Sequence, residues 1–200
     1  MQNNTIERRA LGDFSQIGED PKIQSDYYLE GYATTYGQPY ELFTDSETGI
    51  TYYEMIHPNA LQGAEMKDVV LLYDHDSRVM ARTTNGTLML FPTDPKGLGI
   101  AADMSKSDFA KQIYADTKAG LITGMSWSFV VAPGGDYYNP ETHTRIITKI
   151  KRVYDVSLVS LPQNDQTSVE ARSVIKAAEE NVQKEKLDQQ RRKCRLLLTL

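Results

Sequence analysis

The chain has 200 residues, of which 40% are hydrophobic and 24% charged, as is usual for a globular protein. Its formal net charge of −5 gives no support to nucleic-acid binding as the main activity. The single cysteine, Cys194, cannot form an internal disulfide and suits a reducing compartment. No run of about 18 apolar residues occurs, and no apolar stretch follows Arg8 and Arg9, so we expect neither a membrane-spanning helix nor a secretory signal.

The first half of the chain is predicted to be rich in strands. Residues 1–26 are polar and weakly patterned, which favours an N-terminal arm that can hold one edge strand. Aromatic, consecutive apolar or alternating residues then predict strands at 27–33, 52–56, 68–73, 87–91 and 98–102. The last two are expected to form a hairpin. Pro58, which follows His57, is placed for a first helical turn.

The second half begins with a helix predicted for 105–119, with Ser105 or Ser107 as its N-cap and Gly120 at its C-terminal end. A strand is expected next at Gly124–Val131, followed by a polar loop at 133–143. A return strand is then expected at 144–150 and a final strand at 153–161. No glycine or proline occurs after Pro162, and the weak helical spacing beyond it predicts a long amphipathic tail.

The strand predicted at Gly124–Val131 alternates sharply between large apolar and small polar side chains. Trp127 and Phe129 are expected to face the core, whereas Ser126 and Ser128 lie on the opposite face. Such a strand can hold a serine rigidly at a surface. A half-exposed edge strand with two solvent-facing serines would explain the same pattern.

Of the three histidines, His75 is placed best for chemistry. It directly follows the buried strand predicted at 68–73, where a rigid scaffold presents side chains to a site. It is flanked by Asp74 and Asp76, which would interact with its ring if they lay close. A histidine that only caps the strand would explain the same residues. His57 and His143 are expected to be exposed.

Asp155 lies at the start of an apolar strand, where a carboxylate is costly unless it is paired. Its partner is expected to be Arg152, Lys151 or the ring N–H of a histidine. In the last case the chain would contain a histidine, a serine and an acid in the order His75, Ser126, Asp155. A serine hydroxyl is a weak nucleophile that needs a base to take its proton and an acid to orient that base.

Other chemical motifs are missing from the sequence. Cys194 has no second thiol, no HExxH is present and the histidines are scattered, so we expect neither a metal site nor a cofactor. Gly97 and Gly99 lie in the predicted hairpin and do not begin a phosphate-binding helix. The lack of a GxSxG elbow argues against an α/β-hydrolase.

Taken in order between residues 27 and 171, several segments resemble the tailed-phage prohead (capsid maturation) proteases, which share a fold with the herpesvirus assemblins. These segments are LEGYATTYGQPYEL, YYEMIHPNAL, LLYDHDSRVMART, GTLML with DPKGLGIAADM, AGLITGMSWSF and VYDVSLVSLPQND. The family's histidine falls on His75 and its serine on Ser126. The family's third catalytic position falls on Asp155. Assemblins have a second histidine at this position, whereas phage relatives often have an acid. Many relatives have glycine two residues after the serine, where this chain has Ser128, the alternative nucleophile.

The resemblance implies a mainly β protein with flanking helices, an α+β fold built on an assemblin-like antiparallel β-barrel with a C-terminal helical tail. It divides the chain into three parts. These are an N-terminal arm (1–26), a serine protease domain (27–166) and a helical tail (167–200) that is scaffold-like or removed by self-cleavage.

The implied function is that of a serine endopeptidase inside the immature capsid, the prohead, in the host cytoplasm. His75 would deprotonate Ser126, and Asp155 would orient His75. The expected partners are the major capsid protein, the scaffold protein and the chain itself, with neither nucleic acid nor membrane. Active assemblins dimerise, so a homodimer is a further expectation. The alternatives are a catalytically inert capsid assembly component with a protease-like domain, and an unrelated β-barrel binding module.

Overall fold

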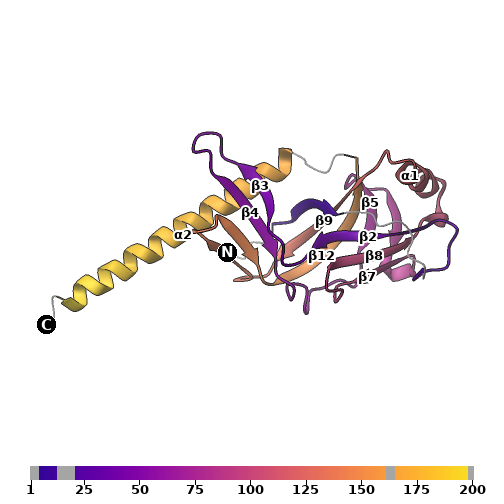
Figure 1. The fold of residues 1–200 in the computed structure, drawn as a ribbon. Coiled ribbons are helices and arrows are strands. Elements are labelled where there is room, and N and C mark those ends of the chain that lie inside the picture. The colour runs from indigo at the N-terminus through magenta and orange to yellow at the C-terminus, as the bar shows by residue number, and fades with distance from the viewer. Residues whose placement is uncertain (1–4, 13–20, 161–164, 198–200) are drawn as a thin grey trace.

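The computed structural model describes residues 5–12, 21–160 and 165–197, whose strands form three sheets (Figure 1). The five-stranded sheet has the order β1 (Glu7–Gly12), β9 (Gly124–Val131), β12 (Ile150–Val159), β5 (Val70–Tyr73), β6 (Val79–Arg82). The four-stranded sheet has the order β10 (Asp136–Asn139), β11 (Thr144–Ile147), β4 (Thr51–Ile56), β3 (Tyr40–Thr44). The three-stranded sheet has the order β2 (Tyr28–Thr35), β8 (Gly97–Asp103), β7 (Leu88–Phe91).

The expected antiparallel barrel is not found, although the mainly β fold class is confirmed. In the described parts of the chain the five-stranded sheet is open, with β1 at one edge and β6 at the other. Two strand pairs are parallel, β12 with β5 and β11 with β4. Parallel neighbours come from segments that are far apart in the sequence, so local alternation predicts the strands but not this pairing.

Strand β9 has the predicted boundaries, but it is an interior strand rather than an exposed edge. It pairs antiparallel with β1 on one side and with β12 on the other. Trp127 and Phe129 are fully buried, as predicted, and their rings stack with centroids 4.2 Å apart. Ser126 and Ser128 are only 2% and 1% exposed. The interpretation of two solvent-facing serines is therefore wrong.

The strand predicted at 144–150 was expected to return beside β9, and this pairing is wrong. The chain leaves this strand at Thr148, whose backbone N–H and that of Lys149 both donate to the Gly135 carbonyl. β11 consequently pairs with β10 and β4, and it is β12 that returns beside β9. Strands β3, β6 and β10 were not predicted because they are short or polar. After Pro58 the chain makes consecutive turns rather than a helix.

The three sheets form the body of the molecule. The short helices lie at one end of this body, and the long C-terminal helix projects from the other end (Figure 1). A 3₁₀ helix, η1 (Thr83–Asn85), precedes β7, and a second, η2 (Met104–Lys106), precedes α1 (Asp108–Lys118). The Ser107 hydroxyl accepts from the Ala110 N–H and caps α1, as one of the two predicted caps. Gly120 follows the helix with a φ of 74°, the left-handed conformation that glycine favours.

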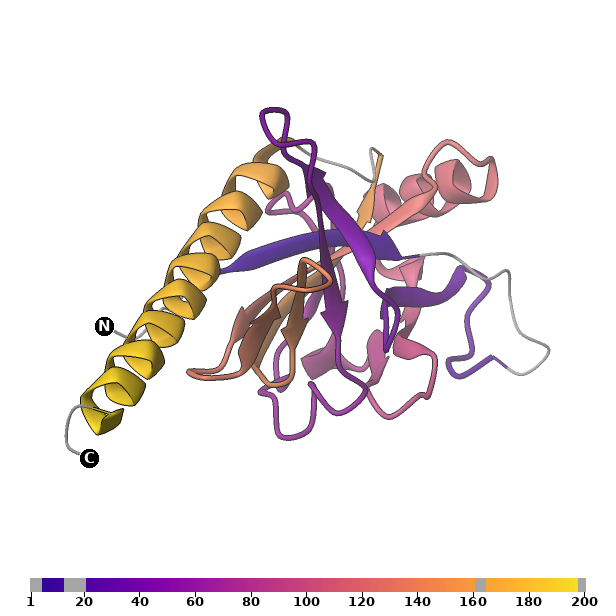
Figure 2. The same cartoon turned by 60° about the vertical axis from the view of Figure 1, so that its left-hand side comes forward.

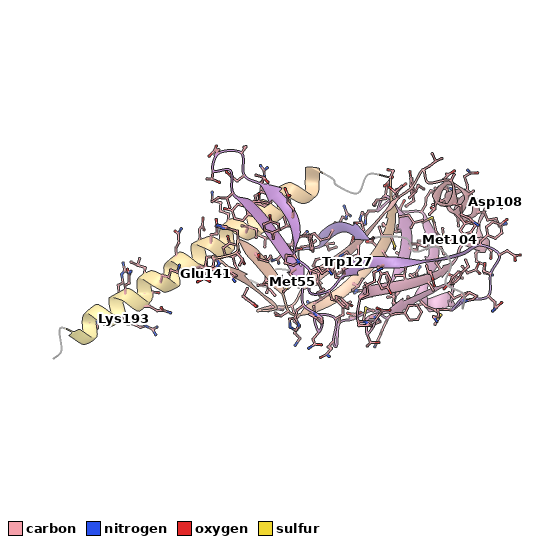
Figure 3. The ribbon with its side chains drawn as sticks, viewed as in Figure 1. Met55, Met104, Asp108, Trp127, Glu141 and Lys193 are labelled. Carbon is pink, nitrogen blue, oxygen red and sulfur yellow. The ribbon has the colours of Figure 1, made fainter. Side chains whose placement is uncertain are left out.

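Helix α2 (Asp165–Leu197) confirms the predicted helical tail, and only its first half packs on the body. Ile175 is 2% exposed in a small cluster with Phe43, Tyr52 and Tyr138. The tyrosine hydroxyls of Tyr52 and Tyr138 both donate to Glu179. Beyond this contact the helix projects away from the sheets, with Lys193 near its free end (Figures 2 and 3).

Strand β1, inside the predicted N-terminal arm, is fastened to the four-stranded sheet by buried charges. Arg9 is 1% exposed and binds Glu54 at 2.6 Å and Glu7 at 2.8 Å. Arg145 binds the same two carboxylates, Glu7 at 2.5 Å and Glu54 at 2.9 Å. Burial alone would raise the pKa of Glu54, but Arg9 and Arg145 lower it to about 2. All four groups are thus paired charges, which is the condition for tolerating them inside a protein.

Candidate active site

The pairing of β9 with β12 gathers four small polar side chains on one face of the five-stranded sheet. Ser126 lies opposite Ser157, and Ser128 lies opposite Asp155. Because alternate residues of a strand share a face, the four side chains form a block two residues wide on each strand. All four residues are buried, with exposed fractions of 8% or less.

The parallel pairing of β12 with β5 brings His75 to this block. Leu158 lies beside Tyr73, the last residue of β5, and His75 follows two residues later. The side chain of His75 is 12% exposed. The strands that supply the serine, the acid and the histidine are therefore immediate neighbours, in the order β9, β12, β5.

The structure brings His75, Ser126 and Asp155 within hydrogen-bonding distance. Nε2 of His75 is 2.7 Å from Oγ of Ser126, and Nδ1 is 2.7 Å from Oδ1 of Asp155. Of the partners considered for Asp155, the histidine is the one at hydrogen-bonding distance, while Arg152 lies 3.6 Å from Glu65. With the Nδ1 proton directed at Asp155, Nε2 is free to accept the proton of Ser126.

Ser128 and Ser157 surround the other nitrogen of the ring. Their hydroxyl oxygens lie 3.2 Å and 3.1 Å from Nδ1 of His75, and Ser157 donates to Asp155 Oδ1 at 2.9 Å. Ser128 is thus placed beside the nitrogen that faces the acid, not beside Nε2. Ser157 was not among the predicted site residues, although its place two residues after Asp155 puts it on the same face.

The carboxyl group of Asp155 is held in its ionised form. Burial alone would raise its pKa, but the hydrogen bond and the charge of His75 lower it, as do hydrogen bonds from Ser128 and Ser157. The net effect is a pKa below the ordinary value of aspartate. An ionised acid at this position can both orient an imidazole and stabilise its protonated form.

The turn that carries His75 has an unusual backbone. Asp74 and His75 have φ values of 47° and 56°, in the left-handed region that non-glycine residues rarely adopt. Each such residue costs about 1–3 kcal/mol and persists only when its surroundings hold it. The flanking carboxylates do not bind the ring: Asp74 accepts two hydrogen bonds from Ser160, and Asp76 accepts two from Ser77.

The other two histidines lie outside this site, and both are half-buried rather than exposed. Nδ1 of His57 accepts from the backbone N–H of Asn59, within the turn after β4. Nδ1 of His143 lies 3.0 Å from the Tyr138 hydroxyl, and its ring packs edge-on against Tyr52. Among the described residues, no group of three or more histidine, cysteine, aspartate or glutamate side chains could hold a metal ion.

A serine, a base and an acid in this arrangement are typical of serine hydrolases, and the surrounding mainly β fold differs from that of an α/β-hydrolase. The family model described as caudovirus prohead serine protease matches residues 17–185. The chain therefore belongs to the caudovirus prohead serine proteases. Comparison with the curated proteins and with the solved structures found no match. Within the described residues, no helix is long and apolar enough to cross a membrane.

As a member of this family the protein is a serine protease of phage capsid maturation. A prohead protease works inside the prohead in the host cell, where it interacts with capsid and scaffold proteins.

Proposed function

We propose that the protein is an endopeptidase that cleaves the scaffold, or a scaffolding segment of the major capsid protein, and its own tail. Ser126 is the nucleophile, His75 the general base and Asp155 the acid that orients it. The observation that carries this proposal is the pair of 2.7 Å contacts that join His75 to Ser126 on one side and to Asp155 on the other.

The proposed reaction follows from this geometry. Nε2 of His75 takes the proton of Ser126 as Oγ attacks the peptide carbonyl, and the imidazolium is stabilised by Asp155. The same proton then passes to the leaving amine, which leaves an acyl group on Ser126. Water then gives a proton to His75 and attacks the acyl carbon. The bond between that carbon and Oγ of Ser126 breaks, His75 returns the proton to Oγ, and the acid product leaves.

The geometry favours Ser126 over Ser128 as the nucleophile. Ser126 faces the ring nitrogen that is free to accept a proton, whereas Ser128 lies 3.2 Å from the nitrogen that faces Asp155. A hydroxyl at that position can support the acid but has no free base beside it. Ser128 is therefore proposed to help hold Asp155.

The proposed self-cleavage site lies in the tail between residues 167 and 193. In the second half of α2 the described side chains from Gln183 onward are exposed, so this part lacks the packing that holds Ile175 in place. A protease needs its substrate extended, and a helix without tertiary contacts unfolds locally at small cost.

The test is the intact mass of the wild-type chain and of Ser126→Ala and Ser128→Ala, each alone and after incubation with the major capsid protein. We expect the wild type and Ser128→Ala to shorten the tail or the capsid protein, and Ser126→Ala to leave both whole. If Ser128→Ala were the inactive variant, the nucleophile would be Ser128. If the wild type cut neither itself nor the capsid protein in assembled proheads, an inert assembly role would replace this proposal.

A further inference from the structure

The turn that presents His75 is held by a carboxylate outside the three proposed catalytic residues. Oδ1 of Asp74 accepts a hydrogen bond from the backbone N–H of Ser160 at 2.9 Å, and Oδ2 accepts one from its hydroxyl at 2.8 Å. Both oxygens of one exposed side chain are therefore directed at a single residue. Nothing in the proposed reaction uses this carboxylate, which calls for another explanation.

The backbone around Asp74 shows what the contact does. The ladder between β5 and β12 ends at Tyr73 and Leu158, and the N–H of Asp74 donates to the Leu158 carbonyl at 2.8 Å. Directly after this bond the chain turns into the left-handed region. Asp74 thus makes three hydrogen bonds to β12 and the residue that follows it, one from its backbone and two to its side chain.

Strand β12 also carries Asp155, so the acid and the support of the base belong to one rigid element. The imidazole must meet Ser126 and Asp155 at 2.7 Å on both sides. Two consecutive left-handed residues relax toward the right-handed region when nothing holds them. That relaxation would swing the His75 ring away from at least one of its partners.

We propose that Asp74 is a positioning residue, which holds His75 in its left-handed conformation by binding Ser160. This inference rests on the proposed function, in which His75 is the base. Asp74 acts through hydrogen-bond geometry and not through its charge, because its carboxylate binds Ser160 and not the ring. Misplacement of a reacting group by about 1 Å can lower a rate by about 100-fold.

The experiment measures the rate at which a fluorophosphonate, a reagent for activated serines, labels the full-length chain between pH 5 and 9. The variants are Asp74→Ala, Asp74→Asn and Ser160→Ala, with Ser126→Ala as the unlabelled reference. Asp76→Ala is the matched control, because Asp76 is also an exposed neighbour of His75 and its carboxylate accepts hydrogen bonds from Ser77 rather than Ser160. Far-ultraviolet circular dichroism and the fluorescence of Trp127 establish that each variant is folded.

We expect Asp74→Ala to react about 100-fold more slowly at every pH, with the midpoint of the pH profile unchanged. Asp74→Asn should stay near the wild-type rate, because the amide can accept from the Ser160 N–H and donate to its hydroxyl. Ser160→Ala keeps the backbone bond and should lie in between. Because the side chains of Asp74 and Ser160 act together, the variant that combines Asp74→Ala with Ser160→Ala should react no more slowly than Asp74→Ala alone.

Three results would overturn the inference while leaving the proposed function intact. These are a wild-type rate in Asp74→Ala, an equal loss in Asp76→Ala, or a loss in Asp74→Asn together with a shifted pH midpoint, which would show an effect of charge. Should Asp74→Ala not fold, Asp74→Asn and Ser160→Ala decide alone, and a wild-type rate in Ser160→Ala rejects the inference. A wild-type chain that is not labelled at Ser126 rejects the proposed function itself.

Discussion

At the scale of single residues, the candidate site is a set of hydrogen bonds whose donors and acceptors each have a defined partner. Asp155 receives hydrogen bonds from His75, Ser128 and Ser157, which together offset the cost of burying its charge. The arrangement leaves one nitrogen of His75 for Ser126. Changes at the acid should therefore alter the chemistry far more than the fold.

We predict that Asp155→Asn remains folded and reacts with a fluorophosphonate about 10⁴-fold more slowly than the wild type, because the wrong imidazole tautomer is then favoured. Ser157→Ala removes one of several hydrogen-bond donors to Asp155 and should lower this rate much less. Arg152→Gln is the control on the same strand, because Arg152 contacts Glu65 rather than the site. An Asp155→Asn variant that reacted as fast as Arg152→Gln would remove the acid from the mechanism.

Much of this site could be predicted from the sequence, and the reasons are local. Alternation along β9 placed Ser126 and Ser128 on one face, and a buried run ending at Tyr73 pointed to His75. Alternation alone could not distinguish Ser126 from Ser128, because the difference depends on which ring nitrogen each hydroxyl meets, and the choice of Ser126 came from the family resemblance. The role of the Asp74 carboxylate depends on Ser160, far away in the sequence.

At the scale of elements, the buried charges of Arg9, Glu7, Glu54 and Arg145 join β1 to the four-stranded sheet. Removing one partner of a buried ion pair leaves the other charge without compensation. We predict that Arg9→Met, measured by urea unfolding, lowers the free energy of unfolding by about 3–5 kcal/mol. Arg8→Met is the control, since Arg8 is its exposed neighbour on the same strand. Equal losses in both variants would contradict a special role for the buried pair.

The same group predicts a dependence on pH. The pKa of Glu54 is about 2 in the folded protein and has its ordinary value of 4.5 in the unfolded chain, so its ionisation favours folding above pH 4.5. As pH falls from 4.5 toward 2, the carboxylate of the unfolded chain takes up its proton first and this contribution is lost. The stability difference between the wild type and Glu54→Gln, followed by urea unfolding, should therefore narrow over this range. A difference that stayed constant would show that Glu54 is not ionised.

Helix α2 offers a matched pair of apolar residues, one on each half. Ile175 is 2% exposed and Leu187 is 47% exposed. Ile175→Ala should lower the free energy of unfolding by about 2–5 kcal/mol, as for other buried large-to-small changes. Leu187→Ala should change it by less than about 0.5 kcal/mol. Equal effects in urea unfolding would mean that the helix does not dock through its first half.

Sequence periodicity predicted α1, α2 and most of the strands, including the four-residue strands β5, β7 and β11. It failed for β3, β6 and β10, which have four or five residues each. It also failed for the partner of β11, since a strand carries no local signal of its neighbour. The barrel came from the resemblance alone, and the open five-stranded sheet departs from it.

At the scale of the whole molecule, a body that carries the proposed site continues into a long helix that is half docked and half exposed (Figure 1). We predict that proheads assembled with Ser126→Ala contain uncut scaffolding segments and a full-length protease tail, as measured by intact mass of their proteins. Proheads assembled with Ser128→Ala should contain shortened forms. Cleaved products in the Ser126→Ala particles would point to another protease or another nucleophile.

The strand order also governs when a newly made chain can become active. β12 is the last strand to leave the ribosome, yet it lies between β9 and β5 and supplies Asp155. A chain whose synthesis has stopped before β12 has neither the acid nor the strand that places His75 beside Ser126. With Ser126, His75 and Asp155 as the proposed catalytic residues, we expect the chain to be inert until β12 has been made and folded beside β9 and β5. Under the proposed mechanism, incomplete chains would therefore leave the capsid proteins synthesised around them uncut.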